Sequence, residues 1–150
     1  MSRLKDCPPG LELLAPVDQL LVHRKVTISE FVSREKADHE YLIGNRFGDR
    51  LYSAYEFSDW GNASCYSENR PFKMRVFSNR GVEAICFDRP FSSCYQCIEA
   101  YSTSHGHIGR VSQICGMCRP TFSVTGITND CFLTIYGPLC CCNSSFDDFK

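Results

Sequence analysis

Residues 73–85 read KMRVFSNRGVEAI, and this stretch decides the fold class. Apolar and polar residues alternate before the turn, with Met74 and Val76 on one face. Asn79 and Gly81 then mark a tight turn, after which a second apolar run begins. A period of two is typical of a β-strand, and a turn containing Asn and Gly between two such runs predicts a β-hairpin.

The same layout recurs in two other places, residues 41–52 (YLIGNRFGDRLY) and residues 122–135 (FSVTGITNDCFLTI). Residues 20–28 also alternate and predict a half-buried strand, although Arg24 interrupts its apolar face. No window of 11 or more residues shows a helical period. We therefore expect an all-β, antiparallel domain.

The strand that begins at Cys131 carries apolar residues on both faces, so it is predicted to be buried on both faces. Free cysteines are most often small buried hydrophobic residues. This interpretation applies best to Cys86 and Cys131, because both lie within strand patterns.

Composition restricts the class of protein. A chain of 150 residues is long enough for one domain with a core of its own. Its 16 Lys and Arg residues nearly balance 17 Asp and Glu residues, which gives no support for a nucleic-acid partner. Residues 1–6 are polar and lack the apolar stretch of a signal peptide, and no apolar run is long enough for a membrane-spanning helix. We expect exposure to the cytosol.

Eleven cysteines are present, but without an export signal we do not expect a secreted disulfide scaffold. Cys94 and Cys97 form one CxxC pair, and Cys115 and Cys118 form a second. Residues 98–114 separate the pairs, a spacing typical of four-cysteine zinc sites. A structural zinc site at these four cysteines is therefore one prediction.

Residues 8–25 (PPGLELLAPVDQLLVHRK) stand before two Arg-Pro-Phe steps, at residues 70–72 and 89–91. Phe122 and the segment Ile-Tyr-Gly-Pro at residues 135–138 follow in order, with a cysteine run behind them. This order of motifs resembles the phospholipid scramblase family. The resemblance covers nearly every residue from Pro8 to the end.

The resemblance implies a tubby-like fold, which is a closed β-barrel around one apolar helix near the C-terminus. We expect residues 1–7 to be a short polar tail and residues 8–150 to be a partial barrel domain. The sequence does not include the motifs of the last strands, of the central helix or of the acidic calcium-binding segment. An unfilled interior is costly, at roughly 24 cal/mol per Å³ of cavity, so we expect low stability or self-association.

The function implied by the resemblance is ATP-independent, calcium-triggered, bidirectional movement of phospholipids between membrane leaflets. The partners would be membrane phospholipids at the cytosolic face of the plasma membrane, and protein partners or homo-oligomers stay open. Calcium is the cofactor by resemblance only. No chemical catalysis is expected, since a cysteine nucleophile needs a histidine base and the nearest ones, His105 and His107, lie in a polar loop.

The resemblance also places Cys94 and Cys97 in the family's cysteine-rich patch, which is palmitoylated and makes these proteins lipoproteins. A denser cysteine run, also a palmitoylation candidate, follows at Cys140, Cys141 and Cys142. One acyl chain anchors a protein only marginally, so at least two would be needed. Of the zinc ligands predicted above, only Cys118 aligns with a usual family cysteine.

Two alternatives to scrambling stay open. One is an acyl-tethered, membrane-associated binding module, in which exposed basic residues attract anionic lipid at about 1 kcal/mol each; the residues are Arg24, Lys25, Lys73 and Arg75. The other is a zinc-stabilised cytosolic interaction domain.

Overall fold

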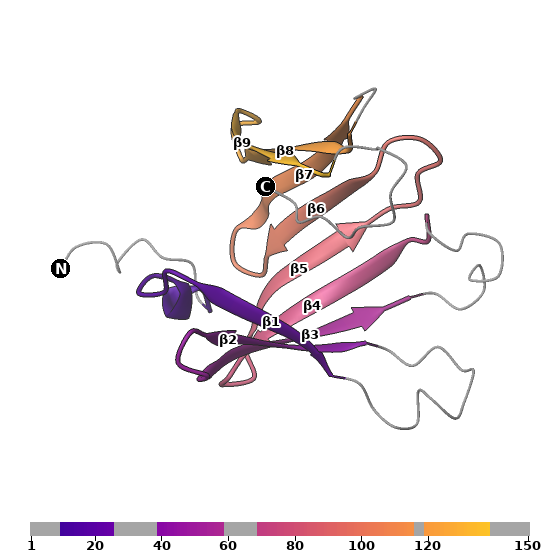
Figure 1. The fold of residues 1–150 in the computed structure, drawn as a ribbon. Coiled ribbons are helices and arrows are strands. Elements are labelled where there is room, and N and C mark those ends of the chain that lie inside the picture. Colours follow the sequence, from indigo (N-terminus) through magenta and orange to yellow (C-terminus); the bar gives the residue numbers. More distant parts are fainter. Residues whose placement is uncertain (1–9, 26–38, 59–68, 116–118, 139–150) are drawn as a thin grey trace.

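The computed structural model describes residues 10–25, 39–58, 69–115 and 119–138. Nine antiparallel strands within them form one sheet, in which spatial order follows chain order (Figure 1). A 3₁₀ turn, η1 (Glu12–Leu14), is the one helical element of the described residues. The all-β antiparallel prediction is confirmed. The strands are β1 (Leu20–Lys25), β2 (Glu40–Asn45), β3 (Arg50–Phe57), β4 (Phe72–Ser78), β5 (Glu83–Arg89), β6 (Cys97–Ser102), β7 (Gly106–Ile114), β8 (Thr121–Gly126) and β9 (Cys131–Tyr136).

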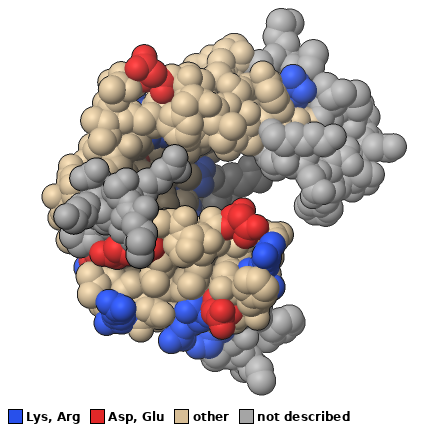
Figure 2. Space-filling view, turned by 90° about the vertical axis from the view of Figure 1, so that its left-hand side faces the viewer, with Lys and Arg blue, Asp and Glu red and all other residues tan. Residues whose placement is uncertain are grey.

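The sheet curves strongly but does not close on itself. In the described part of the chain β1 pairs only with β2, and β9 pairs only with β8. Figure 2 shows the consequence, a deep hollow enclosed by the curved sheet and open on one side. This shape is consistent with an incomplete barrel.

The three hairpins predicted from the sequence are β2–β3, β4–β5 and β8–β9. Gly48 and Gly81 lie in the first two turns with φ of 89° and 77°. Residues with a Cβ rarely adopt this left-handed conformation, so glycine allows each turn to be tight. Backbone hydrogen bonds close the β4–β5 turn, including one of 2.8 Å from the Ser78 amide to the Val82 carbonyl.

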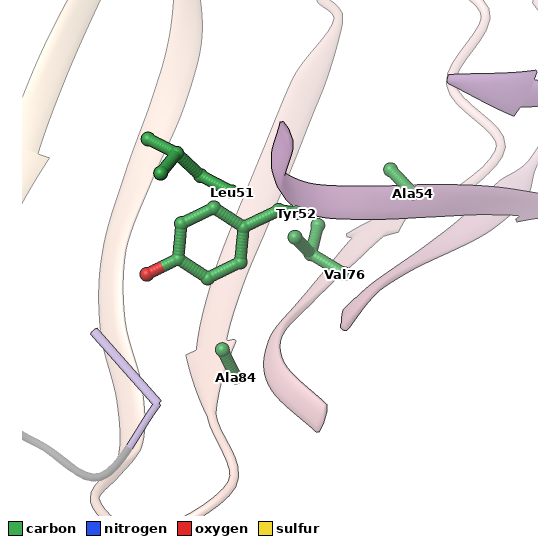
Figure 3. Packing of buried hydrophobic residues seen from close by; sticks show 5 residues of the cluster. All are labelled: Leu51, Tyr52, Ala54, Val76 and Ala84. Atoms are coloured by element: carbon green, nitrogen blue, oxygen red, sulfur yellow. The ribbon is translucent and has the colours of Figure 1, made fainter. Parts of the chain in front are cut away.

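The buried core lies on β3, β4 and β5 rather than across the whole sheet. The Tyr52 ring packs among Leu51, Val76 and Ala84 (Figure 3). Ala54 lies two residues further along β3 and belongs to the same cluster. These five residues are the buried hydrophobic side chains of the described chain. Partly buried residues from the N-terminal segment and from β2, β4 and β5 pack against them; these are Leu11, Leu13, Leu14, Val17, Tyr41, Ile43, Met74, Ile85 and Phe87.

The predictions of burial for two strands are wrong. All six residues of β1 are exposed, where a half-buried strand was expected. In β9, which was expected to be buried on both faces, Phe132 and Leu133 are more than half exposed. The reason is position, because each strand lies at an edge of the open sheet and has a neighbour on one side only. Alternation in sequence reports a strand, but burial needs a second layer.

Antiparallel order sorts the connections into two ends of the sheet. The turns within β2–β3, β4–β5, β6–β7 and β8–β9 lie at one end, which we call the hairpin end. Strands β3, β5, β7 and β9 terminate at the opposite end, where β4, β6 and β8 begin. We call this opposite end the cysteine end, because Cys94, Cys97 and Cys115 lie there.

Candidate functional site

Three candidate cysteines come together at the cysteine end. Cys94 is exposed in the loop between β5 and β6, and Cys97 is half-buried as the first residue of β6. Cys115 is exposed immediately after the last residue of β7, which pairs with β6. The run Cys140–Cys142 and Cys118 lie outside the described residues.

Large apolar side chains are exposed around these thiols. Tyr95, beside Cys94, is 55% exposed, and Phe91 in the same loop is 48% exposed. Ile114, beside Cys115, is 43% exposed. Phe57 and Tyr136, at the ends of β3 and β9, are exposed as well. Exposed apolar side chains are not confined to this end, because Phe47, Val82, Ile127 and Phe132 at the hairpin end are more than half exposed. Among the described residues, the cysteine end is distinguished by the three candidate thiols that lie there with such side chains. Exposed apolar and aromatic side chains are typical of a surface that meets a partner or a membrane interface.

Gln96 holds the loop between β5 and β6 in place, a role that the sequence pattern did not indicate. Its backbone amide donates to Gln113 Oε1 over 3.1 Å, and its carbonyl accepts from the Gln113 amide over 2.8 Å. Its side-chain amide donates to Asn69 Oδ1 and to the Ser92 carbonyl, each over 3.0 Å, while Arg89 donates to its Oε1 over 2.8 Å. These hydrogen bonds connect the loop between β5 and β6 to β5 and to β7. In sequence Gln96 is merely a variable position of a CxxC pair.

The zinc prediction gains no support from the described residues. Cys94, Cys97 and Cys115 share one end of the β6–β7 pair, but in the described part of the chain no three Cys, His, Asp or Glu side chains converge as a metal site would require. Cys118 lies outside the described residues. The zinc site stays a prediction.

Cys86 and Cys131 differ from the cysteines above in position and surroundings. Cys86 is half-buried in the middle of β5, and burial raises the pKa of its thiol. A thiol with a raised pKa is a poor nucleophile. Cys131 is exposed at the hairpin end, so its predicted burial is wrong; it begins the edge strand β9.

Three of the four basic residues proposed to attract anionic lipid lie beside a carboxylate. Lys25 Nζ lies 2.8 Å from Glu40 Oε2, and Lys73 Nζ lies 3.4 Å from Asp88 Oδ2. Arg75 pairs with Glu83. Arg24 Nη2 lies 2.8 Å from His39 Nδ1. On the lower part of the face drawn in Figure 2, acidic and basic side chains lie next to one another. Because a carboxylate accompanies three of the four cations, they do not form the basic surface that the sequence predicted.

Glu99 on β6 is the centre of a charged cluster that it forms with two residues of β7. Arg110 Nε donates to Glu99 Oε1 over 2.6 Å, and His107 Nε2 lies 2.7 Å from Glu99 Oε2. Hydrogen bonding from Arg110, aided by His107, lowers the pKa of Glu99. The Tyr101 ring packs edge-on to His107, with ring centroids 5.5 Å apart. The two histidines considered as bases for a cysteine nucleophile therefore have other partners. His107 lies against Glu99, and His105 Nδ1 lies 2.6 Å from Ser104 Oγ.

The lowered pKa of Glu99 predicts a dependence of stability on pH. Its stabilisation is fully present above the unfolded-state pKa of about 4.3 and is lost as pH falls through the lower folded-state value. At pH 7 we expect Glu99→Gln to lower the free energy of unfolding by about 1 kcal/mol, a modest figure because Arg110 is half exposed. This difference should shrink below about pH 4.

Urea unfolding followed by circular dichroism at both pH values measures the effect. The matched control is Glu40→Gln, which removes the partner of the more exposed Lys25 and should change stability little at pH 7. A Glu99→Gln deficit that persists undiminished in acid would contradict the prediction.

Within residues 10–25, 39–58, 69–115 and 119–138, no helix is both long and apolar enough to cross a membrane.

Comparison with known proteins identifies the family. The Scramblase family model matches residues 1–150. The chain is 35% identical to phospholipid scramblase 2 of Bos taurus over 153 aligned residues, which cover 97% of this chain and 52% of that protein. It is 35% identical to phospholipid scramblase 1 of Homo sapiens, with 97% of this chain and 48% of that protein covered. Identity to human phospholipid scramblase family member 5 is 30%, over 95% of this chain and 56% of that protein.

The chain spans about half the length of the curated relatives it matches. No solved structure matches it. The family match over the whole sequence agrees with the motifs at residues 8–25, 70–72 and 89–91, and with the antiparallel sheet. This chain therefore belongs to the phospholipid scramblase family.

Proposed function

We propose that this protein acts at the cytosolic face of the plasma membrane, in calcium-triggered, ATP-independent movement of phospholipids between leaflets. The described sheet is the part held against the membrane, through acyl chains on Cys94 and Cys97 and on the run Cys140–Cys142. The relatives named above are phospholipid scramblases, which supports the substrate class.

The observation that carries the proposal is that candidate thiols lie together with exposed apolar side chains at the cysteine end. Cys94 and Cys97 lie there with Phe91, Tyr95 and Ile114. An acyl chain attached at this end would enter the bilayer beside side chains that favour the interface. Calcium is proposed by family resemblance alone, and we assign no calcium ligands to this chain.

The test is membrane fractionation after expression in cells, with hydroxylamine-sensitive acylation measured on the same samples. Changing all five candidates, Cys94, Cys97 and Cys140 to Cys142, to Ser should abolish most acylation. The ratio of membrane-bound to soluble protein should fall roughly tenfold or more, because stable anchoring takes two acyl chains.

The matched control changes Cys86 and Cys131 to Ser, and it should remain acylated and membrane-bound. A wild-type protein that carries no acyl group would sink the tether. So would a five-cysteine variant that remains on membranes to the wild-type extent.

The acyl-tethered binding module remains the second candidate, because the same cysteine end would serve it. Vesicles with a fluorescent phospholipid in both leaflets separate the two functions. If calcium makes the inner-leaflet probe accessible to an external quencher, the protein moves phospholipids. If the protein binds the vesicles and only the outer-leaflet probe is quenched, the binding module is correct.

A further inference from the structure

The cysteine end contains a thiol that neither the sequence motifs nor the family resemblance assigned to acylation. Cys115 follows Ile114, the last residue of β7, and is exposed. In sequence it is far from Cys94 and Cys97. Pairing of β6 with β7 removes that separation, because Cys97 lies opposite Ser112 and the pairing continues through the bonds between Gln96 and Gln113.

The loop that begins β6 lies against the end of β7 as a result. These bonds bring Tyr95, the residue before Gln96, to the end of β7, and interaction with Cys115 there raises the pKa of Tyr95. Cys94, the neighbour of Tyr95 in the chain, adds a smaller electrostatic effect in the same direction. Two exposed thiols, on Cys94 and Cys115, therefore flank one tyrosine side chain at the same end of the sheet.

We propose that Cys115 is a second acyl-acceptor site that acts together with Cys94 to tether the protein to the membrane. The inference rests on the acyl tether proposed above and extends it to a residue outside the predicted patch. Two chains that start from adjacent loops would enter the bilayer side by side. A single chain would give only marginal, reversible binding.

The chemistry is a transthioesterification with a long-chain acyl-coenzyme A as donor. The Cys115 sulfur, as the thiolate, attacks the carbonyl carbon of the donor thioester. A new carbon–sulfur bond forms there as the bond from that carbon to the coenzyme A sulfur breaks. Coenzyme A leaves as its thiolate and takes up the proton that the cysteine released, and no oxidant or reductant is needed.

Cys131 provides a matched control within the same sheet. It is also exposed, but it lies at the hairpin end, where the other candidate thiols are absent among the described residues. Both substitutions to Ser replace one exposed thiol by a hydroxyl of similar size, so neither should impair folding. A difference between the two variants therefore reports the position of the thiol.

The experiment counts acylated cysteines in the full chain expressed in cells. Free thiols are blocked, thioesters are cleaved with hydroxylamine, and each released thiol receives a polyethylene-glycol maleimide tag that shifts the band on a gel. We expect Cys115→Ser to lose one tag relative to wild type and Cys131→Ser to lose none. We also expect the double variant Cys94→Ser/Cys115→Ser to release several-fold more protein from membranes than Cys94→Ser/Cys131→Ser.

An unchanged number of tags in Cys115→Ser, while wild type carries several, would overturn the inference and leave the proposed tether intact. Absence of all hydroxylamine-dependent tags from wild type would overturn the tether itself. A thiol at residue 115 released by a reducing agent but not by hydroxylamine would show a disulfide instead and would also overturn the inference.

Discussion

Replacing Tyr52 by Ala should lower the free energy of unfolding by about 3–5 kcal/mol, the range for removing a large aromatic side chain from a core. The side chain is only 2% exposed and packs against Val76 and Ala84. Its hydroxyl also donates to the Gly10 carbonyl over 2.8 Å, which fastens the N-terminal segment to β3. Since domains are stable by only about 5–15 kcal/mol, a large share of the stability would be lost.

Thermal and urea unfolding followed by circular dichroism measure this loss. Tyr52→Phe is the matched control, because it keeps the ring and removes the hydroxyl that donates to Gly10, at a cost of about 1 kcal/mol. Leu133→Ala, at an exposed position on β9, should cost little. If Tyr52→Ala were no more destabilising than Leu133→Ala, the core would not be centred on β3.

Replacing Glu56 by Ala should cost roughly 3 kcal/mol, because it leaves a largely buried cation without its partner. The Glu56 side chain is 7% exposed and pairs with Arg70, whose side chain is 22% exposed. Tyr41 donates a second hydrogen bond to Glu56 Oε2 over 3.2 Å. Burial and the Glu56 charge both raise the pKa of Tyr41, in agreement with the low exposure of the site.

A double-mutant cycle isolates this interaction. Changing Glu56 and Arg70 to Ala together should cost at least 1 kcal/mol less than the sum of the single changes, since no uncompensated charge remains. Glu83→Ala serves as the control, because its partner Arg75 is about half exposed and such pairs contribute about 1 kcal/mol or less. Additive costs for Glu56 and Arg70 would show that the buried pair does not stabilise the fold.

The location of the core also bears on the expected low stability. Buried apolar residues lie on β3, β4 and β5, while Val22 on β1 and Leu133 on β9 remain more than half exposed. A second layer over the rest of the sheet would bury these side chains as well, at about 25 cal/mol per Å² of apolar area. Exposed apolar side chains on the edge strands agree with the expectation of low stability or self-association, which stays a prediction for this chain.

Local pattern was sufficient to predict the strand that begins at Leu20 and three of the hairpins, but it did not identify β6 and β7. Period-two alternation depends on each residue and its near neighbours, and the turns at Gly48 and Gly81 depend on a backbone conformation that glycine adopts readily. The family could be predicted for a similar reason, because its motifs are short and contiguous in sequence. Cys94 and Cys97 became candidates for acylation in the same way.

The tertiary structure decided everything that depends on partners distant in the chain. Burial of Glu56 beside Arg70, the bonds that Gln96 makes to the strands around it, and the position of Cys115 beside Tyr95 all arise from strand register. No local pattern reports such pairing. The exposure of β1 and β9 also depended on the open sheet, because a strand is buried only where other parts of the structure cover it.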